Sequence, residues 1–214
     1  NNATIIRAGR GEPVDENMAD MARLGKDMSG KWRLFLADPE ANVALAKSDV
    51  KSARDSFMQI ATDDPSQGLE YFHRAARAAL LTRDAADAGR IIAQYEELGG
   101  YGSVHEARYA TLQAGLAALG GRTKEALALY KTALAGWRAT HAVWDEALTG
   151  LEMATLLDAA EPDVAAAVAS SRAIFDRLGA KPYVAWLDRL GTSRAPAPGR
   201  PARAAAPSEV AVTE

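Results

Sequence analysis

Three histidines are the side chains of this chain best suited to metal binding or proton transfer, but they do not form a motif. His73, His105 and His141 lie far apart, and "HEARY", which begins at His105, lacks the second histidine that would put two ligands on adjacent helical turns. The chain has no cysteine, which excludes a thiolate zinc site, a cysteine nucleophile and a disulfide framework. We therefore expect that the chain binds no metal and no cofactor. The histidines are expected to be exposed or to line a groove.

Paired carboxylates are a second group of side chains with possible chemistry. Two adjacent carboxylates serve as general acid and general base only in a pocket that shifts their pKa values. The pairs in this chain fall at expected helix ends or on expected solvated faces. This position favours solvated charge over catalysis for all three pairs, Asp63-Asp64, Glu96-Glu97 and Asp145-Glu146.

The stretch "GGRTKEA", residues 120–126, places two glycines and Lys124 just before an expected helix, where a phosphate-binding loop would have them. However, the spacing of a Walker motif is absent, and no strand is expected before the glycines. A tight turn between two helices explains the glycines better than a phosphate site does.

Aromatic residues concentrate in the middle of the chain. They could form a surface on which a ligand stacks, or they could be wedges between adjacent helices. Packing is the favoured interpretation. The residues concerned are Tyr95, Tyr101, Tyr109, Tyr130, Trp137 and Trp144.

Composition limits the elements that can carry these side chains. Hydrophobic residues make up 48% of the 214 residues, and most of them are Ala and Leu, which favour helices. The net charge of −3 is spread along the chain, so no positive field is available for nucleic acid. No apolar run approaches the roughly 20 residues that cross a bilayer. We expect an all-α protein in the cytoplasm that binds neither nucleic acid nor membrane.

Turn signals divide the chain into helix-length segments that form hairpins. Gly120 is expected to end one helix, and the next begins near Thr123. Ser103, with Glu106 three residues later, has the spacing of a capping box. A bulky residue preceded four positions earlier by a small one returns at intervals of 35, 38 and 45 residues, in the pairs Ala53/Phe57, Ala88/Ile92, Ala126/Tyr130 and Ser171/Phe175.

The stretch "GGRTKEALALYKTAL" resembles the second half of a tetratricopeptide (TPR) repeat. The matching positions are Gly121, Ala126, Leu127, Tyr130, Ala133 and Leu134. The resemblance covers roughly residues 32–190 and implies a right-handed α-solenoid of TPR-like helix hairpins, with about four pairs. Tyr130 is then expected to pack against the first helix of its own hairpin.

The stretch "SSRAIFDRLGAKPYVAWLDRL", residues 170–190, is similar to the end of the helical-repeat regions at the C-termini of large bacterial signalling proteins. Those proteins combine an adenylyl or guanylyl cyclase domain, or a DNA-binding domain of the LuxR or SARP type, with a STAND-type ATPase module. None of these modules is present in this chain. The resemblance implies a protein or peptide partner, which includes upstream domains of the same polypeptide.

The TPR resemblance also implies an inner surface lined by the first helix of each pair. Polar residues on that surface could grip an extended peptide or a partner helix, and a merely solvated face is equally compatible with them. The positions carried over are Glu70, His73 and Arg77 in the second repeat, Arg108 and Thr111 in the third, and Asp145, Thr149 and Glu152 in the fourth.

We thus expect three regions: a truncated N-terminal helical segment (1–30), TPR-like repeats (31–191) and a disordered tail rich in Pro and Ala (192–214). The expected function is non-catalytic protein interaction or regulation within a larger signalling protein. One alternative is a sensor domain of a transcriptional activator that binds a small effector. Another is an enzyme with its active site in the groove, against which the absence of a nucleophile, metal or phosphate motif argues.

Overall fold

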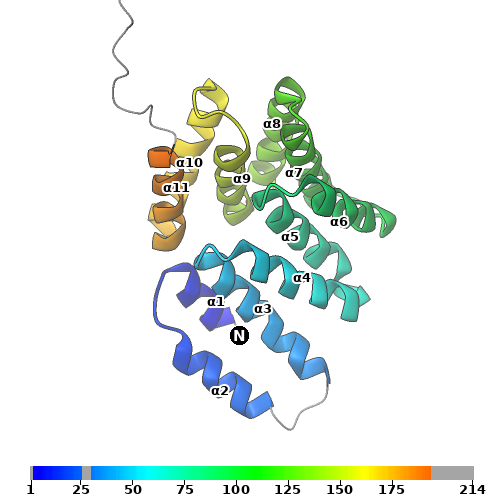
Figure 1. Ribbon diagram of the computed structural model, residues 1–214, viewed down its shortest axis with the longest axis vertical. Coiled ribbons are helices and arrows are strands. Elements are labelled where there is room, and N and C mark those ends of the chain that lie inside the picture. The colour runs from blue at the N-terminus through cyan, green and yellow to red at the C-terminus, as the bar shows by residue number, and fades with distance from the viewer. Residues whose placement is uncertain (1, 26–29, 194–214) are drawn as a thin grey trace, which may run out of the picture.

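The computed structural model describes residues 2–25 and 30–193, and every regular element in those ranges is helical, which confirms the all-α prediction. The chain runs through eleven α-helices and one short 3-10 turn, η1 (Pro65–Gln67), in the described ranges (Figure 1). The helices are α1 (Asn2–Gly9), α2 (Asp15–Gly25), α3 (Gly30–Ala46), α4 (Val50–Asp63), α5 (Gly68–Leu81), α6 (Ala85–Glu97), α7 (Ser103–Leu119), α8 (Thr123–Ala139), α9 (Val143–Leu156), α10 (Pro162–Leu178) and α11 (Lys181–Ser193).

Helices α3 to α10 pack in four consecutive pairs, α3/α4, α5/α6, α7/α8 and α9/α10. The repeating small and bulky residues all lie on the second helix of a pair, and all of them are buried. A small residue lets two helices approach, and the bulky residue one turn later fills the space beside it. These buried residues are Ala53, Phe57, Ala88, Ile92, Ala126, Tyr130, Ser171 and Phe175.

The helix ends agree only partly with the sequence-based expectations. Gly120 ends α7 as predicted, and Gly121 follows it with a φ of 73°, a conformation that glycine adopts without strain. The predicted cap at Ser103 is wrong. Ser103 is the first residue of α7, and the cap position belongs to Gly102, whose φ of 89° suits the sharp entry into the helix.

The first helices of the pairs form an inner layer, in which α5, α7 and α9 contact one another. Contacts between helices distant in sequence then join the two ends of the array. Helix α1 packs on both α3 and α11, and Arg189 of α11 donates a hydrogen bond over 2.7 Å to Ser48, between α3 and α4. In Figure 1, α1 accordingly lies between α3 and the C-terminal helices.

The described residues cover parts of each of the three expected regions. Within the expected 1–30 segment, Asn2–Gly9 and Asp15–Gly25 form α1 and α2, and α1 packs on α3 and α11 with Thr4 and Ala8 buried. Helix α2, by contrast, has no buried residue. At the other end, α11 continues through Thr192, where the expected tail begins, and residues 194–214 lie outside the described ranges.

Candidate functional site

A cavity of about 610 Å³ lies where the ends of the array meet. Its walls come from α1 and the adjoining Arg10, from α3, α4, α5 and α9, and from the end of α10, Ala180 and the start of α11. The volume is within the range of about 300–1,000 Å³ that is typical of sites for small ligands. Helix α1, which packs on α3 and α11, covers part of the cavity.

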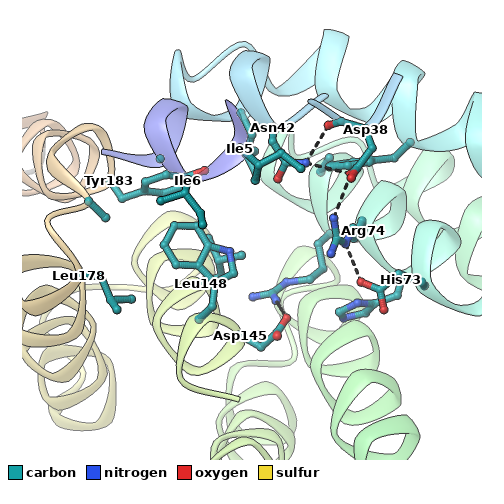
Figure 2. Close-up of a pocket in the computed structure, with 18 of the residues that line it drawn as sticks. Ile5, Ile6, Asp38, Asn42, His73, Arg74, Asp145, Leu148, Leu178 and Tyr183 are labelled. Carbon is teal, nitrogen blue, oxygen red and sulfur yellow. Dashed lines mark hydrogen bonds and ion pairs between the residues drawn. The ribbon is translucent and has the colours of Figure 1, made fainter. Parts of the chain in front are cut away.

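The cavity has a polar side and an apolar side (Figure 2). Helices α3 and α5, with one residue from α9, supply most of the polar side, and α1, α9, α10 and α11 supply most of the apolar side. This division suits a molecule with hydrogen-bonding groups at one end and hydrocarbon at the other. The polar residues are Asp38, Asn42, Glu70, His73, Arg74, Arg77 and Asp145, with Asn2 and Arg10 at the two ends of α1, and the apolar ones include Ile5, Ile6, Trp144, Leu148, Leu178 and Tyr183.

Arg77 is held by partners on α9 through all three of its nitrogen atoms. Its Nε donates to Glu152 Oε2 over 3.3 Å, Nη1 to Asp145 Oδ1 over 3.2 Å, and Nη2 to Thr149 Oγ1 over 3.3 Å. The side chain is only 7% exposed. A planar guanidinium with five N–H donors can satisfy such a set of acceptors without leaving its own plane. The arrangement fixes the relative position of α5 and α9.

Glu152 lies behind Arg77, away from the cavity, with a side-chain exposure of 0%. Tyr130 donates its hydroxyl proton to Glu152 Oε1 over 2.7 Å. Burial raises the pKa of Glu152, although the nearby Arg77 and the two hydrogen bonds act in the opposite direction. Tyr130 contacts Ala114 and Ala117 of α7, as expected, but its hydroxyl also reaches the next repeat.

Arg74 is the second guanidinium on the polar side, and it bridges α3 and α5. Its Nε donates to Glu70 Oε1 over 2.6 Å and its Nη1 to Asp38 Oδ1 over 3.3 Å. Asp38 also accepts a hydrogen bond of 3.0 Å from Asn42 Nδ2. The other carboxylate oxygen of Glu70 pairs with Arg108 of α7. Figure 2 shows Arg74 between the α3 side chains and His73.

His73 lies on the cavity wall but is 2% exposed, between the rings of Tyr95 and Trp137. Burial, followed by the charge of Arg77, holds the pKa of His73 well below its usual value, so the imidazole is neutral. Its Nε2 is buried and has no hydrogen-bond partner among the described residues. His73 is therefore a buried polar group with unused hydrogen-bonding capacity.

The structure brings the eight residues carried over from the TPR resemblance into one layer. Glu70, His73, Arg77 and Asp145 line the cavity. Thr149 and Glu152 lie behind them as partners of Arg77, and Arg108 pairs with Glu70. Thr111 is buried and accepts a hydrogen bond of 3.2 Å from Trp137 Nε1. The polar groups of this layer thus serve mainly as partners for one another.

Sequence reasoning missed Arg74, Asp38, Asn42 and the α1 residues of the cavity. Arg74 follows Glu70 by four residues, a spacing that puts the two side chains side by side on a helix and could have suggested the ion pair. No comparable signal exists for α1, because its contacts with α3 and α11 depend on how far the array curves.

Several other sequence-based expectations are settled by burial. Glu146 was expected on a solvated face, which is wrong, because it is buried and accepts a hydrogen bond of 2.7 Å from Arg138. Tyr95, Tyr130 and Trp137 are buried, as the packing interpretation predicts. Tyr101 contradicts that interpretation, since it is 98% exposed.

Comparison with known proteins identifies no relative: no family model, no curated protein and no solved structure matches this chain. Within the described ranges, no group of three or more His, Asp or Glu residues could hold a metal ion. The helices of those ranges are all too short or too polar to span a membrane.

Proposed function

We propose that this chain is a non-catalytic regulatory module of a larger bacterial signalling protein, built as a right-handed TPR-like solenoid, and that it senses a small molecule in its inner cavity. The supporting observation is the cavity itself, with one polar and one apolar side, at the place where α1 and α11 join the ends of the array. A ligand there would contact helices from both ends. The proposal places the protein in the cytoplasm, without a cofactor and without direct contact with nucleic acid or membrane.

The pairing of the inner residues favours a small molecule over an extended peptide. A peptide gripped by the inner face would need free donors and acceptors along several repeats. Thr149 and Glu152 instead both accept hydrogen bonds from Arg77, and Arg108 is paired with Glu70. Opening these pairs would leave buried charges unpaired, which costs more than a surface hydrogen bond returns.

A titration with Nile red, an uncharged fluorescent dye, tests whether the cavity accepts an apolar molecule. We expect saturable binding with a blue shift of the emission. Leu148→Trp fills the apolar side and should abolish that binding, whereas Val143→Trp, on the exposed start of the same helix, should preserve it. Dye binding that survives Leu148→Trp, or no saturable binding at all, would contradict a cavity that binds small molecules.

A second candidate function, docking of a protein partner, is favoured by an exposed apolar turn between α6 and α7. Tyr101 is fully exposed there, and Leu98, Val104 and Tyr109 are also exposed. Clusters of this kind mark interaction sites more often than isolated apolar residues do. A photocrosslinking residue at position 101 of the full-length polypeptide should link to a domain outside residues 1–214. Crosslinks confined to residues 1–214 would contradict this candidate.

A further inference from the structure

We propose that the cavity selects an uncharged amphipathic molecule, with its hydrogen-bonding end against Asp38, Asn42 and Arg74 and its apolar end against Ile6 and Leu148. This inference rests on the proposed function, because it specifies the ligand of the same cavity. Figure 2 gives the orientation: the labelled polar groups of α3 and α5 lie on one side, and Ile6 and Leu148 lie on the other.

The absence of net charge on the ligand follows from the ion pairs of the polar side. Arg74 already pairs with Asp38 and Glu70, and Arg77 already pairs with Asp145 and with Glu152 behind it. An ionic group on the ligand would have to break one of these pairs or remain without a counter-ion, unless an anionic group reached the exposed Arg10 at the cavity wall. Breaking a pair or leaving a charge without a counter-ion is less favourable than binding an uncharged group, because a charge in the cavity loses part of its solvation.

An uncharged polar group, by contrast, can use capacity that the ion pairs leave over. Asn42, which lines the cavity, donates from its Nδ2 to Asp38. Its Oδ1 is left as an acceptor. The hydrogen bonds of Arg74 to Asp38 and Glu70 use Nη1 and Nε, which leaves the N–H donors on Nη2. A hydroxyl or amide, which both donates and accepts, fits this combination.

The apolar end is assigned from α1. This helix buries only Thr4 and Ala8, and Ile6 is 54% exposed although it lines the cavity. A hydrocarbon chain lying between Ile6 and Leu148 would remove both side chains from water, and such burial is the main source of affinity for apolar groups. Ligand binding would thereby hold α1 more firmly on α3 and α11.

Three probes with the same octyl chain test the inference: octane-1,2-diol, octanoate and octylammonium. Binding is followed through the ¹³C methyl resonances of Ile5, Ile6 and Leu148. We expect the diol to shift these resonances with a Kd about tenfold or more below that of either ion, because the ions carry an unpaired charge into the site. The variant Asn42→Leu should weaken binding of the diol and leave the spectrum of the remaining chain unchanged.

Arg10 provides the sharpest control, because it is an exposed cation at the cavity wall and has no ion pair with any described residue. If octanoate binds tightest and Arg10→Gln abolishes this preference, the ligand is an anion and the inference is wrong. Tightest binding of octylammonium would overturn it as well. In both cases, or if Nile red binds and no octyl probe does, the proposed function survives. Failure of all four probes overturns both proposals.

Discussion

Arg77 of α5 and Glu152 of α9 are 75 positions apart in the sequence, yet Arg77 Nε lies 3.3 Å from Glu152 Oε2. The two helices belong to different pairs, with the α7/α8 pair between them in the chain. Tyr130 of α8 completes the contact through its hydrogen bond to the same carboxyl group. One buried ion pair therefore connects the second, third and fourth helix pairs beside the cavity.

Removing Arg77 should destabilise the fold strongly. Arg77→Met keeps much of the side-chain volume but leaves Glu152 buried without its cation. Loss of one partner of a buried ion pair typically costs about 3–5 kcal/mol. We expect a decrease of that size in the free energy of unfolding measured by urea denaturation. Arg90→Met, which removes only an exposed pair with Asp87, should change it by less than about 1 kcal/mol.

Glu152→Gln should be milder than Arg77→Met. The amide can still accept the hydrogen bond from Tyr130, and Arg77 retains Asp145 and Thr149 as partners. Because burial raises the pKa of Glu152, its ionised form is disfavoured in the folded protein, and its contribution to stability falls as the pH rises above about 4.5. Between pH 4.5 and 7, the free energy of unfolding of Glu152→Gln should therefore rise relative to that of the wild type. An unchanged difference would contradict the role of burial.

His73 should make the fold sensitive to mild acid. Its pKa is lowered by burial, so the folded state holds the neutral ring while the unfolded chain takes up a proton near pH 6.5. The stabilising contribution is complete above that pH and is lost as the pH falls below it, by up to about 1.4 kcal/mol per pH unit. Denaturation curves at pH 7.5 and 5.5 should show this loss in the wild type. The variant His73→Phe should lack the loss of stability that protonation of His73 causes. The control variant His141→Phe, at an exposed turn, should lose stability with falling pH as the wild type does.

Gly150 should be intolerant of a side chain, unlike Gly89. A Cβ atom at position 150 would lie 2.0 Å from Ser171 Oγ and 2.7 Å from the backbone oxygen of Ala167, on the facing helix α10. Gly150→Ala should therefore lower the free energy of unfolding by about 1–3 kcal/mol, the typical cost of overpacking. Gly89→Ala meets nothing within 4 Å inside α6 and should raise it by up to about 1 kcal/mol. Equal effects of the two substitutions would contradict the close approach of α9 and α10.

The attachment of α1 should depend on Ala8. Ala8→Asp places a carboxylate at a buried position facing the rest of the fold, and we expect α1 to detach while the four helix pairs remain folded. Hydrogen exchange should then speed up in α1, by about tenfold or more, with little change in α7 and α8. Ala3→Asp, at an exposed position of the same helix, is the matched control. If α1 stays protected in Ala8→Asp, it is not held by this contact.

The sequence predicted the features that depend on neighbours within one helix or one hairpin. The recurrence of Ala126 and Tyr130 predicts both a helix and its buried face, because side chains four positions apart lie on the same side of it. The turn at Gly120 followed from the same local chemistry. Capping was less predictable: Gly102 rather than Ser103 holds the cap position, because the path of the preceding loop decides where the first helical residue falls.

The sequence by itself determined that the chain is all-helical and that its helices pair, and its resemblance to TPR repeats assigned Arg77, Asp145 and Glu152 to the inner layer. Only the tertiary structure decided that these charges pair with one another and that α1 and α11 close a cavity beside them. The reason is that local structure depends on residues close together in the sequence, whereas tertiary contacts depend on residues far apart. Helix periodicity acts over a few residues, whereas the meeting of Arg77 with Glu152 depends on the summed packing angles of every helix between them.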